Sequence, residues 1–222
     1  MRPAAFLDRD GVLNDLIIDR ASGAGESPLR VEDVSLMPGA PAALARLIEA
    51  GFMLVCVSNQ PAAAKGQVSV GRLLAVHERV ISLLAEQGIP FAAWCLCLHH
   101  PHGVLSQLAG PCSCRKPAPG MLLGAAVALG IDLAGSWMVG DTDGDIGAGR
   151  AAGCRTLLIR HPASVHKRTR GVSPDVAAGS LAEGVSDFLG GRSETIATSP
   201  GSYGDAAVGG HHARSDFDTD IR

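Results

Sequence analysis

Two aspartates, Asp8 and Asp10, follow directly after the short apolar run 4–7 and precede Gly11. Burying carboxylates is costly unless a cation or hydrogen bonds compensate their charge, so the pair needs a specific reason. Residues i and i+2 of an extended segment point the same way, so both carboxylates can face one site. One carboxylate can attack phosphorus, while the other protonates a leaving alcohol and then activates water. We therefore predict a nucleophile paired with an acid/base.

Two further apolar runs also end in polar residues. One leads into Ser58 and Asn59, and another leads into Asp141 with Asp145 shortly after it. A single strand that ends in Asp is usually a turn or a helix cap, but that reading does not explain the whole set. Because parallel strands share one carboxyl edge, we expect these groups to converge with Asp8. The first two aspartates together with Asp141 suit Mg²⁺, which also takes waters and substrate phosphate.

The segment RKPAPGM begins with Arg115 and Lys116, just ahead of a helix expected over 119–130. Phosphoryl transfer needs cations and hydrogen-bond donors around the phosphate oxygens. Arg115 suits bidentate phosphate binding, and Lys116 can act as a point charge between nucleophile and phosphate. Ser58 and Asn59 supply hydroxyl and amide donors. The alternative is a solvated basic pair in front of a helix.

Four of the six cysteines lie in the segment 95–117, where three thiols and an imidazole could bind one metal ion. The predicted ligands of this zinc site are Cys97, His99, Cys112 and Cys114. Three neighbours compete with them as ligands: Cys95, His100 and His102. A Cys₃His set is typical of closed structural zinc sites, although this spacing is not the common zinc-finger one. The alternative is a group of reduced structural cysteines. We expect a structural zinc that staples the loop 95–116 and holds Arg115 and Lys116 in place.

Short apolar runs alternate with helical patterns along most of the chain. Strands are expected over 4–7, 52–60, 91–98, 136–141 and 154–159, and helices over 38–51, 69–87, 119–130 and 145–153. This alternation predicts an α/β fold: a doubly wound, Rossmann-like and mostly parallel sheet with helices on both faces. We expect one domain over 1–190 and a disordered tail over 191–222, in which His211 and His212 are solvated.

Composition excludes several classes of protein. The net charge of −3, from 19 basic and 22 acidic residues, provides no basic footprint for nucleic acid. Apolar runs such as 52–57 are far shorter than the roughly 20 residues that a membrane span needs. The N-terminus becomes charged too early for a secretory segment. We therefore predict a cytoplasmic protein with reduced cysteines and no nucleic-acid or membrane partner.

Four segments resemble the motifs of the haloacid dehalogenase (HAD) superfamily of phosphatases. They are FLDRDGVLND (6–15), VSNQ (57–60), RKP (115–117) and VGDTDGD (139–145), and their order and spacing cover residues 4 to about 160. The short distance from the first motif to the first helix leaves no room for a large cap domain. The pattern CxHHP…CxCRKPxPGM resembles the branch of heptose-bisphosphate and histidinol-phosphate phosphatases.

This resemblance implies specific roles. Asp8 would be the nucleophile and Asp10 the acid/base, and Mg²⁺ would be held by Asp8, Asp141 and the Asp10 backbone carbonyl. Ser58, Asn59, Arg115 and Lys116 would contact phosphate or sugar. Asp145 would orient Lys116 and reach the metal through water. The chain departs from relatives at Thr142, where they often carry Lys or Arg.

We therefore predict a Mg²⁺-dependent phosphatase that removes the 7-phosphate of a heptose 1,7-bisphosphate through an aspartyl-phosphate. Its partner would be a small phosphorylated sugar, and the protein would be a monomer. The enzymatic alternative is a histidinol-phosphate phosphatase. A second alternative is a catalytically silent, zinc-stapled module that binds a phosphorylated ligand. A glycosyltransferase using Asp8 and Asp10 as a DxD motif leaves Lys116 and Asp141 without a role.

Overall fold

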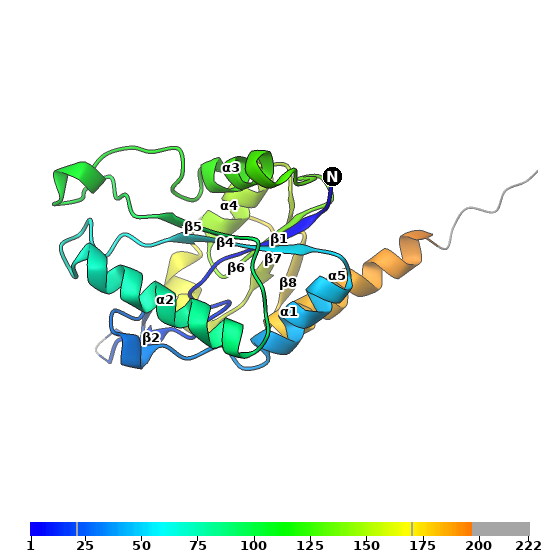
Figure 1. The fold of residues 1–222 in the computed structure, drawn as a ribbon, viewed down its shortest axis with the longest axis horizontal. Coiled ribbons are helices and arrows are strands. Elements are labelled where there is room, and N and C mark those ends of the chain that lie inside the picture. The colour runs from blue at the N-terminus through cyan, green and yellow to red at the C-terminus, as the bar shows by residue number, and fades with distance from the viewer. Residues whose placement is uncertain (21, 170, 197–222) are drawn as a thin grey trace, which may run out of the picture.

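The central element is a six-stranded parallel sheet with the strand order β5-β4-β1-β6-β7-β8 (Figure 1). The computed structural model describes residues 1–196 except 21 and 170, and of residues 191–196 only the backbone. The strands are β1 (Ala4–Leu7), β4 (Met53–Asn59), β5 (Ala93–Cys97), β6 (Trp137–Gly140), β7 (Arg155–Ile159) and β8 (Val176–Ala178). The strand order reverses at β1, so ligands are expected at the carboxyl ends of the central strands.

Five helices cover the two faces of this sheet. They are α1 (Ala40–Glu49), α2 (Val70–Glu86), α3 (Gly120–Leu129), α4 (Asp143–Ala151) and α5 (Leu181–Ile196). Helices α3 and α4 cover one face, whereas α1, α2 and α5 cover the other (Figure 1). The doubly wound α/β prediction is therefore confirmed.

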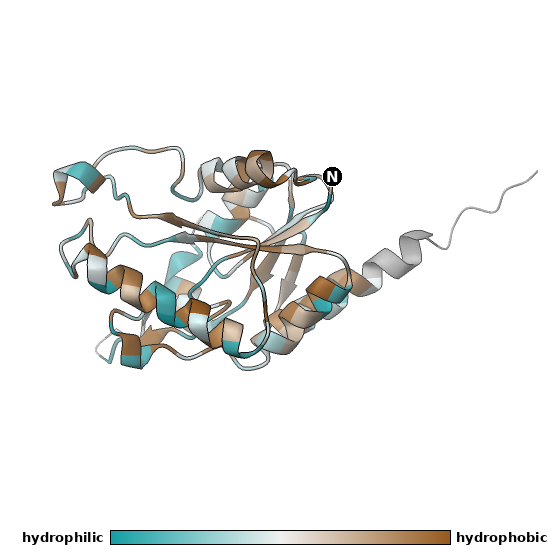
Figure 2. Cartoon of the chain, in the orientation of Figure 1, coloured by the Kyte–Doolittle hydropathy of each residue, from teal (hydrophilic) through white to brown (hydrophobic). Residues whose placement is uncertain are grey.

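The central strand β1 shows why the sheet has two cores. Its four residues are fully buried, and successive side chains point to opposite faces. Ala5 and Leu7 pack with α1, α2 and α5, whereas Ala4 and Phe6 pack with α3 and α4. The hydropathy colouring shows apolar strands beneath α2, which carries polar residues as well, and α3, which is apolar along its length (Figure 2). Apolar burial on both faces is characteristic of parallel strands.

Short elements complete the chain. A hairpin of β2 (Ile17–Ile18) and β3 (Gly25–Glu26) lies apart from the main sheet. Three 3₁₀ helices are η1 (Val31–Asp33), η2 (Ser106–Leu108) and η3 (Pro162–Lys167). The hairpin and η3 both follow carboxyl-edge strands, so they lie near the expected ligand site.

The last helix, α5, spans the end of the domain expected from the sequence. The domain was expected to end at residue 190, whereas the backbone of α5 is helical to Ile196. The first half of α5 packs on the core: Leu181, Val185 and Phe188 are buried at helical spacing, and Phe188 contacts Phe52 edge-on with ring centroids 5.4 Å apart. The rest of the predicted tail, 197–222 with both of its histidines, lies outside the described residues.

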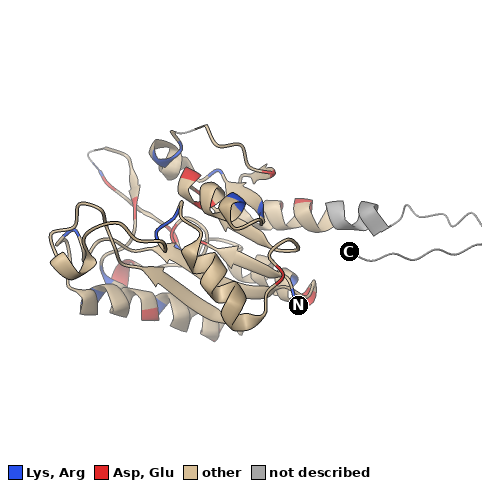
Figure 3. Ribbon diagram, turned by 90° about the horizontal axis from the view of Figure 1, so that it is seen from above, with Lys and Arg blue, Asp and Glu red and all other residues tan. Residues whose placement is uncertain are grey.

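Acidic and basic residues are interspersed over several elements of the ribbon in Figure 3. Among the described residues, no helix is long and apolar enough to span a bilayer.

Candidate active site

The carboxyl ends of three neighbouring strands bring the predicted groups together. Asp8 follows β1, Ser58 lies at the end of β4, and Asp141 follows β6. All three line one cavity of about 370 Å³. The other predicted residues that line it are Asp10, Asn59, Arg115, Lys116 and Asp145. The predicted convergence of distant segments is therefore present in the structure.

Lys116 lies at the floor of this cavity and is only 5% exposed. Its Nζ is 2.9 Å from Asp8 Oδ1 and 2.5 Å from Asp145 Oδ1, and it donates to the Val57 carbonyl oxygen at 2.7 Å. Burial alone lowers the pKa of this ammonium, but the charges of Asp145 and Asp8 raise it overall. Lys116 therefore has three partners for its three hydrogens, and one of them is Asp145, the acid that the resemblance implied would orient it. Its action on a bound phosphate stays a prediction.

Asp8, Asp141 and Asp145 form the carboxylate cluster of the site, with one oxygen from each within 4.8 Å of the others. Burial, reinforced by neighbouring carboxylates, raises the pKa of Asp141 to about 8, and that of Asp8 to about 6 despite Lys116. Asp141 Oδ1 is buried and has no hydrogen-bond partner. A divalent ion would offset the repulsion among these carboxylates and would give Asp141 Oδ1 a partner, so the donor set fits Mg²⁺.

The turn after Asp8 makes this close approach possible. Gly11 has φ +81°, and a Cβ at this position would collide with Oδ2 of Asp141. Glycine therefore serves two purposes here, because it adopts the left-handed conformation without strain and leaves room for the carboxylate. The amide nitrogens of Leu13 and Asn14 both donate to the Arg9 carbonyl oxygen, which closes the turn.

Asp10 faces a different set of partners from Asp8. Arg9 donates to it from Nε and Nη2, both at 3.1 Å, and Asn14 Nδ2 donates at 2.9 Å. Ser27 Oγ and Gln60 Nε2 donate to Oδ2 at 2.7 Å and 2.6 Å. Burial raises the pKa of Asp10, but the Arg9 charge and these hydrogen bonds lower it overall. The carboxylate lies outside the described metal cluster, so the structure does not bring the Asp10 side chain to the predicted Mg²⁺ ligands.

The predicted phosphate donors differ in how their side chains are used. Ser58 is buried, and its Oγ accepts a hydrogen bond from Gln60 Nε2 at 3.1 Å. The Asn59 side chain bonds the Lys116 backbone in both directions, at 3.0 Å each, which leaves one Nδ2 hydrogen for a ligand. Arg115 Nη1 donates to the His99 carbonyl oxygen at 3.1 Å. Their contact with phosphate stays a prediction.

Thr142 and Asp145 form the start of α4. Asp145 Oδ2 accepts from the Thr142 backbone nitrogen at 3.0 Å and from its hydroxyl at 2.6 Å, which completes a capping box. The helix therefore begins at Asp143, two residues earlier than the sequence predicted. The cap fixes Asp145 while its other oxygen holds Lys116.

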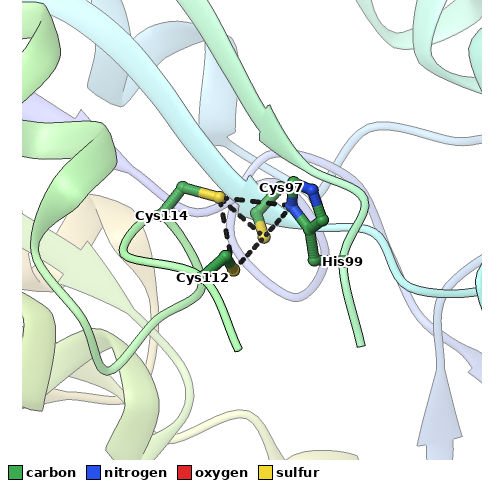
Figure 4. Close-up of side chains that lie close together, drawn as sticks. All are labelled: Cys97, His99, Cys112 and Cys114. Atoms are coloured by element: carbon green, nitrogen blue, oxygen red, sulfur yellow. Dashed lines mark hydrogen bonds between the residues drawn. The ribbon is translucent and has the colours of Figure 1, made fainter. Parts of the chain in front are cut away.

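A second cluster lies at the end of the edge strand β5 (Figure 4). Its members are Cys97, His99, Cys112 and Cys114, the four residues predicted from the sequence. Their sulfur atoms lie 3.2–3.7 Å apart, and His99 Nδ1 lies 3.5 Å and 3.8 Å from two of them. Tetrahedral zinc thiolates place their sulfurs roughly 3.7 Å apart, so the cluster fits zinc. The three competing candidates are outside it: Cys95, His100 and His102.

Two serines near the site were not anticipated. Ser27, beside β3, bonds Asp10, and the fully buried Ser164, in η3, donates to Asp141 Oδ2. Arg168 Nη1 donates to the Asp141 carbonyl oxygen at 3.3 Å. Nothing in the local sequence around these residues marks them, since each contact depends on loops far apart in the chain. Gln60 could have been found, because it directly follows the Ser58–Asn59 pair.

Comparison with known proteins identifies the family. A HAD-hydrolase-like family model matches residues 113–184. A D-glycero-beta-D-manno-heptose-1,7-bisphosphate 7-phosphatase of Yersinia pestis is 37% identical over 157 residues, which cover 71% of this chain and 79% of that protein. The D-glycero-D-manno-heptose-1,7-bisphosphate 7-phosphatase of Thermosynechococcus vestitus is 39% identical over 163 residues, or 72% and 79% of the two chains. The chain belongs to this family of HAD-like phosphatases.

Solved structures of HAD-like phosphatases share the fold. A D,D-heptose 1,7-bisphosphate phosphatase from B. bronchiseptica, complexed with magnesium and phosphate, matches with a TM-score of 0.70 and 30% identity over 85% of this chain and 99% of that chain. A HAD-like phosphatase from Mesorhizobium loti matches with a TM-score of 0.68 and 32% identity, covering 85% of both chains. The resemblance found in the motifs is confirmed, and the protein is a phosphoric monoester hydrolase.

Proposed function

We propose that this phosphatase removes the 7-phosphate of D-glycero-D-manno-heptose 1,7-bisphosphate, with Asp8 as the nucleophile. The observation that carries the proposal is the buried ion pair of Asp8 and Lys116 beside Asp141, at the floor of a cavity open to a ligand. An ammonium and a divalent ion on either side of a carboxylate form a site for a phosphoryl group. The names of the relatives support the choice of sugar.

The reaction then proceeds in two balanced steps. Asp10 takes up a proton from solvent when the substrate binds. An Asp8 oxygen then forms a bond to phosphorus, the bond from phosphorus to the sugar oxygen breaks, and Asp10 gives that proton to the sugar oxygen. A water next attacks phosphorus, Asp10 takes its proton, and the Asp8–phosphorus bond breaks. Mg²⁺, held by Asp8 and Asp141, supplies positive charge to the phosphate oxygens when bound. Asp145 keeps Lys116 charged and in place throughout.

Cations around the cavity favour a substrate with two phosphates. Besides Lys116, the lining includes Lys65, Arg115 and Lys167. Arg115 donates to the His99 carbonyl oxygen, and Lys167 donates to the Gly25 carbonyl oxygen and forms a long ion pair of 3.9 Å with Glu26. Lys116 and the metal ion would already neutralise the phosphate that reacts. The remaining positive charge is suited to the second phosphate of a sugar bisphosphate.

We assign zinc to the cluster of Cys97, His99, Cys112 and Cys114 as a structural ion. Four protein ligands complete a tetrahedron and leave no position for water, so this metal takes no part in the chemistry. Its role follows from the contacts: His99, a ligand, also provides the carbonyl oxygen that holds Arg115, and Lys116 follows Cys114 by two residues. Zinc thereby holds the segment that carries the cations of the active site.

Phosphate release from several substrates tests the proposal. The parent protein with Mg²⁺ should hydrolyse the heptose 1,7-bisphosphate with a higher kcat/KM than histidinol phosphate, and Asp8→Asn should reduce turnover by about 10⁴-fold or more because the nucleophile is lost. Faster turnover of histidinol phosphate would favour the enzymatic alternative. Phosphate binding without release would favour the silent binding module. Comparing α and β anomers determines which one the cavity accepts.

Location and assembly are separate proposals. We expect the reaction in the cytoplasm, where phosphorylated sugars are made and where thiols stay reduced for zinc. We also expect a monomer. Light scattering at micromolar concentration tests the assembly state, and a dimer would contradict it.

A further inference from the structure

Ser27 connects the β2–β3 hairpin to the acid/base. It directly follows β3, it lines the active-site cavity, and its Oγ lies 2.7 Å from Asp10 Oδ2. It is the one partner of Asp10, among the described side-chain contacts, that comes from the hairpin; Arg9 and Asn14 belong to the turn after β1, and Gln60 follows β4. The orientation of Asp10 therefore depends on a segment that lies apart from the main sheet.

Tight packing fixes where the hairpin places Ser27. Lys167 Nζ donates to the Gly25 carbonyl oxygen at 2.8 Å. A Cβ on Gly25 would lie 2.7 Å from Ala163 Cβ and from Leu16 Cδ1, closer than real contacts allow. Only glycine lets the hairpin approach η3 this closely. Ser27 lies two residues after Gly25. The contacts of Gly25 with Lys167, Ala163 and Leu16 therefore fix where the Ser27 side chain enters the cavity.

The hydroxyl of Ser27 differs chemically from the other partners. The Arg9 guanidinium can only donate, and Asn14 and Gln60 present NH₂ groups that donate to Asp10. The Ser27 hydroxyl carries a single hydrogen on a short side chain. In the observed arrangement it donates to Oδ2 together with Gln60, so it fixes the direction of the Asp10 carboxyl from the hairpin side.

We propose that Ser27 is a positioning residue that keeps the Asp10 carboxyl aimed at the leaving oxygen through both halves of the reaction. This role rests on the proposed function, because it requires a leaving alcohol that Asp10 must protonate. The proton passes from Asp10 to the sugar oxygen as the bond to phosphorus breaks, while the Ser27 hydroxyl stays a donor to Oδ2. No bond to Ser27 forms or breaks.

The leaving group of the substrate tests this role. A sugar alkoxide must be protonated as it departs, whereas p-nitrophenolate departs without a proton. In Ser27→Ala, kcat/KM for the heptose bisphosphate should fall on the order of tenfold or more, since acid catalysis contributes about 10²–10⁴. The kcat/KM for p-nitrophenyl phosphate, which reports transfer to Asp8, should stay within about twofold. Ser27→Thr keeps a hydroxyl and should recover most of the activity on the sugar.

A matched control comes from the same hairpin. Ser22 Oγ bonds Asp19 at 2.7 Å and does not line the cavity, so Ser22→Ala should leave both kcat/KM values unchanged. An equal loss on both substrates in Ser27→Ala, or no loss on the sugar, would overturn the role of Ser27. If the parent protein itself released no phosphate from either substrate, the proposed function would fail, and the role of Ser27 with it. The two failures are therefore distinguishable.

Discussion

Two clusters in the described part of the chain can hold a metal ion, and they differ in how open they are. In the cluster of Asp8, Asp141 and Asp145, a buried Lys116 pairs with two carboxylates and a cavity adjoins the site. In the Cys₃His cluster, the four side chains face one another, with their sulfur atoms 3.2–3.7 Å apart (Figure 4). The first cluster leaves room for a ligand, while the second leaves none.

This difference indicates which metal serves chemistry. Oxygen ligands with an open position suit Mg²⁺, which keeps waters and binds substrate phosphate. Three thiols and an imidazole with no open position suit zinc in a structural role. The two clusters are nevertheless linked through the segment from Cys112 to Lys116. Cys112 and Cys114 are members of the second cluster, and Lys116 pairs with carboxylates of the first. We expect changes in the first to affect catalysis most and changes in the second to affect stability most.

The largest effect should come from Lys116→Met. The substitution leaves Asp8 and Asp145 buried without their shared cation, and removes the charge beside the phosphate. We expect kcat to fall about 10²–10³-fold, as for loss of a transition-state donor, with a stability loss of about 3–5 kcal/mol. Initial rates and urea unfolding measure the two effects. Nearly normal kcat in a folded variant would refute the role of Lys116.

Loss of a zinc ligand should reduce stability more than it reduces catalysis. Cys112→Ser leaves an incomplete tetrahedron at the end of β5, so we expect substoichiometric zinc by elemental analysis. We also expect a stability loss of roughly 3 kcal/mol, or about 10 °C in Tm. Activity on p-nitrophenyl phosphate, assayed well below Tm, should fall less than in Lys116→Met. Full zinc content in the variant would argue against this ligand set.

A change of pH should have a smaller effect on the stability of the metal-free protein. Burial and the charges of Asp8 and Asp145 raise the pKa of Asp141 to about 8, well above its unfolded value near 3.9. Between those values the metal-free folded state binds more protons than the unfolded state, so its stability falls as pH rises toward 8. The slope is at most about 1.4 kcal/mol per pH unit for each proton.

Mg²⁺ reverses this trend, because it takes the place of the proton among the carboxylates. The Tm increase on adding MgCl₂ to EDTA-treated protein should therefore be larger at pH 8 than at pH 6. Scanning calorimetry at both pH values measures it. The same increase at both would mean that proton and metal do not compete at Asp141.

The smallest effect is expected from Cys95→Ala, which tests whether this cysteine belongs to the zinc cluster. Cys95 lies on the same strand as Cys97, but its thiol is outside the cluster. Cys95→Ala should keep one zinc per chain and change Tm by only a few degrees, since the side chain is half-buried. Zinc loss in this variant would mean that Cys95 is a ligand. Comparison with Cys112→Ser separates a ligand from a neighbour of the same residue type.

The sequence by itself determined the chemistry of the site and the class of fold. Apolar runs at strand length, alternating with helical patterns, required buried parallel strands, and the polar groups after 4–7, 52–57 and 136–139 then had to meet at one edge. The members of the Cys₃His cluster were also evident, because the four side chains occur within 18 residues, 97–114. These conclusions depend on local pattern and on the general geometry of parallel sheets, which a single chain displays directly.

Tertiary structure alone decided how each side chain is used. It turned the Asp10 carboxylate toward Arg9 and Ser27, and it paired the Asn59 amide with the Lys116 backbone. These outcomes depend on contacts between segments tens of residues apart, whose approach is set by packing at single positions such as Gly11 and Gly25. Residue type and spacing do not specify which of several possible partners a buried polar group will find.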